Sequence, residues 1–300
     1  MAEVESTLSA FSDALAAAVE RAATSIVSVH ARRRQPASGV AFEGGVIVTA
    51  DHVIEQEEEI TIGLPDGKRV SAKLAGRDSG TDLAVLRPDG GAPAALATGA
   101  AARPGTIVLA VGRPGSAGAV VSLGVVSSVG GPARTWRGGQ LEGFIRTDAT
   151  MYPGFSGGPL IDAAGRMLGI NTSGLSRGAG LTLSVATVQR VVGQLVQHGK
   201  VRRGFLGISS QPLRLPEALA GKAGGQATGL LIVGTEPGGP AERGGVLVGD
   251  ILVGLAGAAV KDTDDLQSQL GGERIGQALP VSVLRGGEPL ELSVTIGERG

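Results

Sequence analysis

Residues 147–160 read Thr-Asp-Ala-Thr-Met-Tyr-Pro-Gly-Phe-Ser-Gly-Gly-Pro-Leu. Ser156 lies among three glycines, and a proline flanks this group on each side. A serine hydroxyl becomes an effective nucleophile when a base removes its proton and backbone N–H groups stabilise the charge that develops on the substrate. Glycines let the backbone turn such N–H groups inward, because they tolerate positive φ angles. The stretch therefore predicts a nucleophilic serine in a tight loop.

A base for this serine must come from a small set, because the chain has three histidines. His30 lies in a strand-like run and His198 ends a helical pattern, so we expect both to be structural. His52 directly follows the apolar run that ends at residue 50. This position, at the end of a predicted strand, favours His52 as the general base.

Two aspartates, Asp82 and Asp78, are candidates for the carboxylate that orients His52. Asp82 opens an apolar strand, where a buried carboxylate can hold one imidazole nitrogen and stabilise the imidazolium. Asp78 lies in a glycine-containing turn, and we expect it to be solvated. The resulting order of His52, Asp82 and Ser156 is that of chymotrypsin-type barrel proteases.

The same serine also matches the loose G-x-S-x-G elbow of α/β-hydrolases. That elbow requires a helix directly after the serine, and Gly157, Gly158 and Pro159 disfavour one. An esterase of that class is therefore the weaker interpretation.

Composition sets further limits. The chain has 300 residues, of which 42% are hydrophobic, and a net charge of -1. The charge gives no sign of a nucleic-acid partner. The 51 glycines have no fixed period and fit a protein of short strands and tight turns. Cysteine is absent, which excludes disulfides and thiolate chemistry. No segment approaches the roughly 18 apolar residues that span a bilayer.

Hydrophobic patterns divide the chain into a helix and two β-rich regions. Residues 7–23 have helical spacing, and a second helical stripe ends at Gly199, a good stop signal. Between them we predict strands at 25–30, 45–49, 59–64, 69–75, 83–87, 106–111, 120–129, 166–171 and 181–185. After a polar linker at 199–203, we predict strands at 205–210, 229–235, 250–255, 281–284 and 290–296, with helical pieces at 240–244 and 263–270.

Four strings resemble the HtrA/Deg family of serine proteases: residues 48–53, 81–86, 147–160 and Gly-Ile-Asn-Thr at 169–172. Residues 203–208, 229–233, 237–245 and 249–252 resemble that family's PDZ domain. The resemblance implies a mainly β fold, with a chymotrypsin-like double β-barrel at 25–200 and a smaller α+β PDZ domain at 204–298. It also makes the helical segment 1–24 a candidate trimer contact.

The resemblance assigns roles residue by residue. His52, Asp82 and Ser156 are the expected catalytic triad, and the N–H groups of Gly154 and Ser156, with Phe155 between them, the oxyanion hole. The expected specificity pocket, which takes a small or medium aliphatic side chain, consists of Thr150 at its base and Asn171, Thr172, Ser173 and Leu181. The expected peptide site of the PDZ domain consists of Gly204, Phe205, Leu206, Gly207 and Ile208, with Leu266 and Leu270 lining its pocket or filling the core.

Some positions depart from the family's pattern. Phe155 stands where Asn is usual, and Asp51 stands before His52 where Asn or Ala is usual. A carboxylate at residue 51 would favour the protonated imidazole if it lies close. The stretch 128–143, with Trp136, resembles the family's sensor loop, and a disordered surface loop is the alternative.

The expected function is that of an ATP-independent serine endopeptidase that cuts unfolded or damaged proteins and needs no cofactor or metal. Its expected partners are unfolded polypeptides, C-terminal peptides at the PDZ domain and two further copies in a homotrimer. The alternative is a catalytically weak chaperone or peptide-binding scaffold on the same fold. The first residues, Met-Ala-Glu-Val-Glu, have no recognisable signal-peptide pattern. The family resemblance implies the periplasm or cell envelope, and the cytoplasm is expected if Met1 is the natural start.

Overall fold

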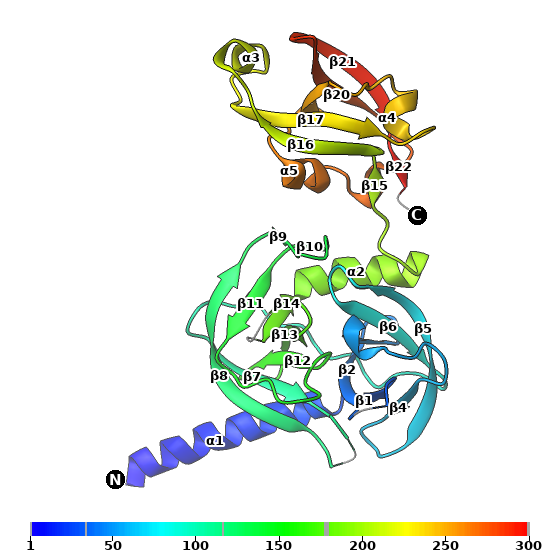
Figure 1. Ribbon diagram of the computed structural model, residues 1–300. Helices are drawn as coiled ribbons and strands as arrows, with labels where there is room; N and C mark the ends of the chain where they lie inside the picture. The colour runs from blue at the N-terminus through cyan, green and yellow to red at the C-terminus, as the bar shows by residue number, and fades with distance from the viewer. Residues whose placement is uncertain (1, 34, 116, 177–179, 299–300) are drawn as a thin grey trace. The chain divides into compact units, whose positions relative to one another are not determined.

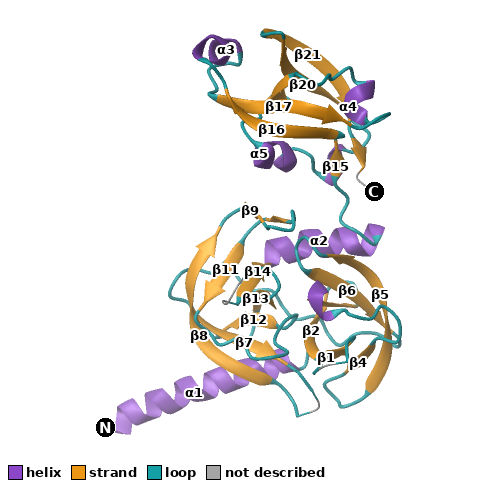
Figure 2. Cartoon of the chain, viewed as in Figure 1, coloured by secondary structure: helices purple, strands orange, loops and turns teal. Residues whose placement is uncertain are grey.

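The computed structural model describes residues 2–33, 35–115, 117–176 and 180–298. The chain forms two compact units, Met1–Val201 and Arg202–Gly300 (Figure 1). Strands dominate both units, and helices are few (Figure 2). The predicted mainly β fold class is therefore confirmed.

The first unit contains two closed six-stranded barrels. In the first barrel the strand order is β1-β2-β3-β6-β5-β4. Its strands are β1 (Ile26–His30), β2 (Ala37–Phe42), β3 (Val46–Ala50), β4 (Thr61–Gly63), β5 (Arg69–Asp78) and β6 (Leu83–Pro88). In the second barrel the order is β11-β14-β13-β12-β7-β8. Its strands are β7 (Ile107–Gly112), β8 (Val120–Gly130), β11 (Phe144–Thr147), β12 (Pro159–Asp162), β13 (Met167–Thr172) and β14 (Leu181–Ser184).

The two barrels share a hydrophobic core, as strand β3 illustrates. All five β3 residues are buried. Ile47 belongs to the core inside the first barrel, whereas Val46 and Val48 belong to a cluster that also contains Ile161 and Ile170 of the second. Successive strand residues point to opposite faces, so one strand can serve both cores. This packing fixes the loops of one barrel against those of the other.

Two helices flank the barrels. Helix α2 (Val185–His198) begins after Ser184, whose side chain accepts a hydrogen bond from the N–H of Thr187, and ends at Gly199 in the left-handed conformation, as predicted. Helix α1 (Ala2–Ala23) is longer than the predicted 7–23. In Figure 1 its N-terminal half projects away from the barrels.

The second unit is a twisted sheet with the strand order β16-β17-β18-β20-β21 and short flanking helices. The strands are β15 (Gly204–Phe205), β16 (Ile208–Arg214), β17 (Thr228–Thr235), β18 (Ile251–Leu255), β19 (Ala258–Ala259), β20 (Ala278–Arg285), β21 (Glu288–Thr295) and β22 (Gly297–Glu298). The helices are α3 (Glu217–Lys222), α4 (Pro240–Arg243) and α5 (Thr263–Ser268). Helix α5 lies against β16.

Candidate active site

The backbone pairing of β3 and β6 brings His52 and Asp82 together. Ala50 pairs with Leu83 in the antiparallel ladder. His52 follows β3 in a short 3₁₀ turn (Asp51–Val53), and Asp82 directly precedes β6. The two side chains therefore emerge from the same end of the first barrel, although they are thirty positions apart in the sequence.

The carboxylate of Asp82 holds His52 by two hydrogen bonds. Its Oδ2 lies 2.8 Å from Nδ1 of the imidazole, and its Oδ1 accepts from the backbone N–H of His52 at 2.9 Å. Asp82 is fully buried, whereas a quarter of the His52 side chain is exposed. A carboxylate that accepts from Nδ1 places the proton there and leaves Nε2 as the basic nitrogen.

Asp82 adopts the left-handed backbone conformation, with φ of 57°. Such a conformation is uncommon for a residue other than glycine and persists where surrounding contacts determine it. The Asp82 carbonyl accepts from the N–H of Asp51 at 3.0 Å, and Thr172 Oγ1 donates to Asp82 Oδ2. Thr172, predicted as a pocket wall, thus also contacts the Asp82 carboxylate.

The two neighbouring acids have structural partners. Asp78 is buried, not solvated as predicted, because its carboxylate accepts from the N–H and hydroxyl of Thr81 at 2.9 and 2.7 Å. It thereby closes the turn that precedes Asp82. Asp51 is also buried and accepts from Nε of Arg77 at 2.5 Å. The extra carboxylate beside His52 is therefore paired with a guanidinium.

Ser156 lies in the loop between β11 and β12 of the second barrel. Gly154 and Gly157 on either side have φ of 87° and 85°, which only glycine adopts readily. Strand β2 anchors the loop: the N–H of Ser38 donates to the carbonyl of Ser156 at 3.2 Å, and the Ser38 hydroxyl to the carbonyl of Gly154 at 2.7 Å. Both barrels therefore shape the nucleophile loop.

The oxyanion-hole donors follow from the same loop. Within the described part of the chain, the N–H groups of Gly154 and Ser156 donate to no acceptor, so both are available for a substrate oxygen. The N–H of Phe155 instead donates to the carbonyl of Tyr152 at 3.0 Å, and supplies no such donor. The Phe155 ring is buried and meets the Tyr152 ring edge-on, with 5.4 Å between their centroids. The unusual phenylalanine thus fills core space.

A cavity of about 370 Å³ joins these groups. Its lining includes His52, Gly154, Phe155, Ser156, Asn171, Thr172 and Ser173. Within it, Ser156 Oγ lies 3.1 Å from Ser173 Oγ, and no hydrogen bond joins Ser156 to His52 among the described residues. Sequence reasoning placed Ser173 in the pocket wall and missed its contact with the nucleophile.

Two residues of the expected specificity pocket lie outside this cavity. Thr150 has an exposed side chain, and its carbonyl accepts from the Ser122 hydroxyl at 2.6 Å. Leu181 is buried in the core that the barrels share. Met151 lines the cavity instead, because the chain turns inward one residue after Thr150. The assignment of Thr150 to the base of the specificity pocket stays a prediction.

The expected peptide site of the second unit lies at the start of β16. Gly207 has φ of 75°, and the N–H groups of Leu206 and Gly207 donate to no acceptor among residues that the structure describes. Free N–H groups in a tight turn suit a peptide carboxylate. Leu266 and Leu270 are both buried in the core of the unit, together with Leu206.

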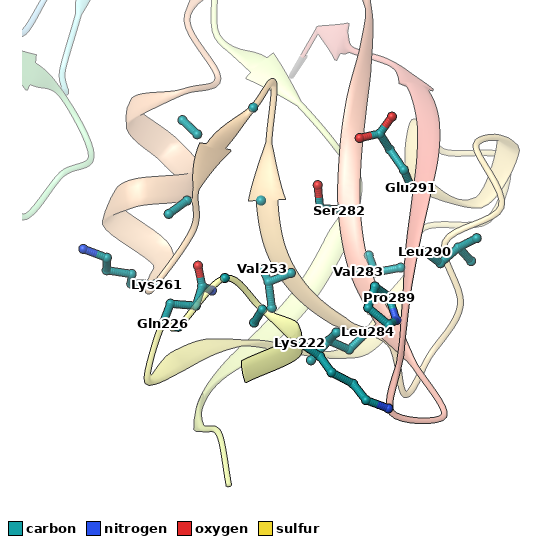
Figure 3. A pocket seen from close by; sticks show the side chains of 17 residues that line it. Lys222, Gln226, Val253, Lys261, Ser282, Val283, Leu284, Pro289, Leu290 and Glu291 are labelled. Atoms are coloured by element: carbon teal, nitrogen blue, oxygen red, sulfur yellow. The ribbon is translucent and has the colours of Figure 1, made fainter. Parts of the chain in front are cut away.

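A second cavity, of about 830 Å³, lies elsewhere on this unit (Figure 3). Residues of β18, β20 and β21 line it, with Lys222, Gln226 and Lys261 at its edge, and no residue of β16 or α5 contributes. It is therefore not the expected peptide groove.

The described residues include no group of three or more potential metal ligands. Among them, no helix is both long enough and apolar enough to cross a membrane.

Two closed β-barrels, with a His–Asp pair on one and a glycine-bounded serine on the other, define the chymotrypsin-like class of folds. Comparison with known protein families gives the same fold class for this unit. A family model described as a trypsin-like peptidase domain matches residues 37–170, and one described as a PDZ domain matches residues 204–296.

Curated relatives narrow the class. The chain is 34% identical over 278 residues to a probable periplasmic serine endoprotease DegP-like of Rhizobium meliloti, covering 89% of this chain and 54% of that protein. It is 31% identical to the serine endoprotease DegS of Salmonella typhimurium, covering 94% of this chain and 85% of that protein. The chain thus spans about half the length of the DegP-like relatives.

A solved structure extends the likeness to three dimensions. The HtrA-type protease AlgW with decapeptide is 32% identical, with a TM-score of 0.78, covering 95% of this chain and 99% of that one. The chain belongs to the HtrA/Deg family of serine proteases, as its sequence motifs predicted.

Proposed function

We propose that this protein is a serine endopeptidase whose catalytic triad is His52, Asp82 and Ser156. One observation carries the proposal: a carboxylate-bound imidazole and a serine with two unpaired neighbouring N–H groups line one cavity. Relatives named as serine endoproteases support it.

The residues divide the reaction between them. His52 Nε2 takes the proton of Ser156 Oγ as this oxygen attacks the peptide carbonyl carbon. The carbonyl oxygen becomes negative and accepts hydrogen bonds from the N–H groups of Gly154 and Ser156. Asp82 stabilises the imidazolium, which then gives its proton to the departing amine. A water molecule, deprotonated by His52, repeats the sequence and releases the acyl group from Ser156.

The proposed substrates are unfolded or damaged polypeptides, cut in protein quality control. The cavity wall contributed by Met151 is apolar, and the described lining residues include no carboxylate, although Arg32 adds a cationic side chain. Such a site suits small or medium aliphatic side chains and discriminates weakly between them, by about 1–3 kcal/mol per methylene. Broad specificity of this kind fits many different unfolded substrates.

We also propose regulation by C-terminal peptides at the second unit. The unpaired N–H groups of Leu206 and Gly207, beside the edge strand β16, support capture of a terminal carboxylate. A peptide with a free C-terminus should raise casein cleavage by the full chain, whereas the same peptide with a C-terminal amide should not. Equal effects of both peptides would contradict carboxylate capture.

Helix α1 is the proposed contact of a homotrimer. Leu8 and Phe11 on its projecting half are 64% and 45% exposed, whereas Ala18 and Ala22 are fully buried. A largely exposed helix with apolar side chains gains stability from partner subunits. Light scattering should give three copies for the native chain and fewer for Phe11→Ala. A native monomer would refute the trimer.

The relatives named as periplasmic favour the periplasm or cell envelope as the location of this protein.

A catalytically weak chaperone or peptide-binding scaffold is the second candidate. The hydrogen bond of Ser156 to Ser173 rather than His52 favours it. Cleavage of β-casein by the native chain and by Ser156→Ala separates the two functions. We expect cleavage by the native chain alone, with Ser71→Ala on exposed strand β5 as an active control. Absence of cleavage under all conditions would favour the scaffold.

A further inference from the structure

Ser173 contacts the nucleophile although it belongs to a different strand region. It directly follows β13, its side chain is exposed, and its Oγ lies 3.1 Å from Ser156 Oγ. A serine hydroxyl carries one proton and can donate it to one acceptor at a time. When Ser156 is the donor, its single hydroxyl proton points to Ser173 and is not available to the base.

The backbone around Ser173 is fixed on both sides. The N–H of Gly157 donates to the carbonyl of Asn171 at 2.9 Å, and the N–H of Asn171 to the carbonyl of Gly158 at 2.9 Å. These bonds join the Ser173 segment directly to the nucleophile loop. The separation of the two hydroxyls is therefore set by the protein backbone, and only side-chain rotation can break their contact.

The residue after Ser173 adds a further constraint. The N–H of Gly174 donates to Thr172 Oγ1 at 2.9 Å, and Thr172 in turn donates to Asp82. A side-chain carbon at residue 174 would lie 2.5 Å from Asp82 Oδ2, so the segment packs directly on the catalytic carboxylate. The segment 172–174 thus contacts all three members of the triad.

We propose that Ser173 is a positioning residue that holds Ser156 in a resting orientation, away from His52, until a peptide substrate enters the cavity. The inference rests on the proposed triad. Ser173 lines the cavity and is exposed, so a peptide lying there covers it and breaks its contact with Ser156. Ser156 then turns to Nε2 of His52.

The test compares the native chain with Ser173→Ala, using a small fluorophosphonate that labels active-site serines. Ser156 Oγ displaces fluoride from phosphorus, and its proton passes to His52. The reagent is too small to cover Ser173, so native labelling is slowed by the resting contact. We expect Ser173→Ala to label three to ten times faster, the ratio that corresponds to losing one neutral hydrogen bond of about 1 kcal/mol. Ser173→Thr, which keeps the hydroxyl, should label at nearly the native rate.

Peptide hydrolysis gives a second readout. A saturating peptide already displaces Ser173, so Ser173→Ala should raise kcat/KM by a similar factor and leave kcat within about twofold of the native value. Native labelling with no acceleration in Ser173→Ala would overturn the inference while keeping the triad, and so would equal acceleration in Ser173→Thr. Equal labelling of the native chain and Ser156→Ala would overturn the triad itself and the inference with it.

Discussion

Thr172 Oγ1 donates a hydrogen bond to Oδ2 of Asp82, the same oxygen that lies 2.8 Å from Nδ1 of His52. A buried carboxylate must have its lone pairs satisfied, since an unpaired charge in the interior is costly. The threonine hydroxyl therefore satisfies one oxygen of the Asp82 carboxylate and helps to orient it.

The first prediction concerns this hydroxyl. Thr172→Val keeps the side-chain shape and removes the donor. Hydrogen bonds to charged groups contribute about 1.5–3 kcal/mol, so kcat/KM for a peptide should fall at least about tenfold. Thr172→Ser retains the hydroxyl and should remain near native activity. Native activity in Thr172→Val would show that Asp82 does not depend on this bond.

A second prediction uses the absence of a side chain at Gly174. A methyl group there would lie 2.5 Å from Asp82 Oδ2 and 2.8 Å from His52 Nδ1, within van der Waals overlap. Gly174→Ala should therefore separate the pair and lower kcat by about 100-fold, the scale of a 1 Å misplacement. The matched control is Gly193→Ala on helix α2, where no atom lies within 4 Å of an added carbon. It should retain full activity and gain about 0.4–1 kcal/mol in stability.

The third prediction concerns the hairpin of β9 (Ala133–Arg134) and β10 (Gln140–Leu141), in the stretch predicted as a sensor loop. Thr135 Oγ1 donates to the carbonyl of Gly80 at 2.7 Å, and Gly139 packs on the same backbone. This contact is two residues from Asp82.

Gly139→Ala should push the hairpin against the Gly80 turn and reduce kcat/KM, with little change in the midpoint of thermal unfolding. An alanine at Gly131, where nothing lies within 4 Å, provides the control and should have no effect. Unchanged hydrolysis by Gly139→Ala would show that the turn tolerates displacement. Trp136, between β9 and β10, is 75% exposed, so a binding partner could reach the hairpin there.

The fourth prediction is a pH dependence in the second unit. Burial alone would raise the pKa of the Asp250 carboxyl, but hydrogen bonds from Arg285 and the N–H of Leu247 outweigh it, and the pKa lies below its usual value. A lowered folded-state pKa stabilises the fold above the unfolded-state pKa of about 3.9, and this stabilisation disappears as the pH falls through the folded-state value.

Asp250→Asn should therefore destabilise the second unit by about 2 kcal/mol at pH 7, and by progressively less as the pH falls below the unfolded-state pKa and through the folded-state pKa of Asp250. Urea unfolding followed by amide NMR signals of β18 measures this difference. The exposed Asp264→Asn is the control, with little expected change across this pH range. A destabilisation that is equal across this range would contradict the ionic origin.

Local sequence predicted much of the fold. Strong apolar runs between glycine, proline and aspartate located most strands, and Gly199 located the end of α2. Three barrel strands were missed, namely β2, β11 and β12. Strand β2 carries Ser38 and Gly39, and the conformation of all three strands depends on pairing with neighbouring strands, which no local pattern reveals.

The candidate site divides in the same way. The sequence by itself determined the glycine-bounded serine, a histidine after one strand and an aspartate before another, because each needs a particular local backbone. Tertiary structure alone decided which groups meet: Thr172 with Asp82, ninety positions apart, Ser173 with Ser156, and Met151 rather than Thr150 in the cavity. The physical reason is that contacts between residues far apart in the sequence depend on which strands pair and on how the two barrels pack, and the periodicity of a single strand carries no information about either.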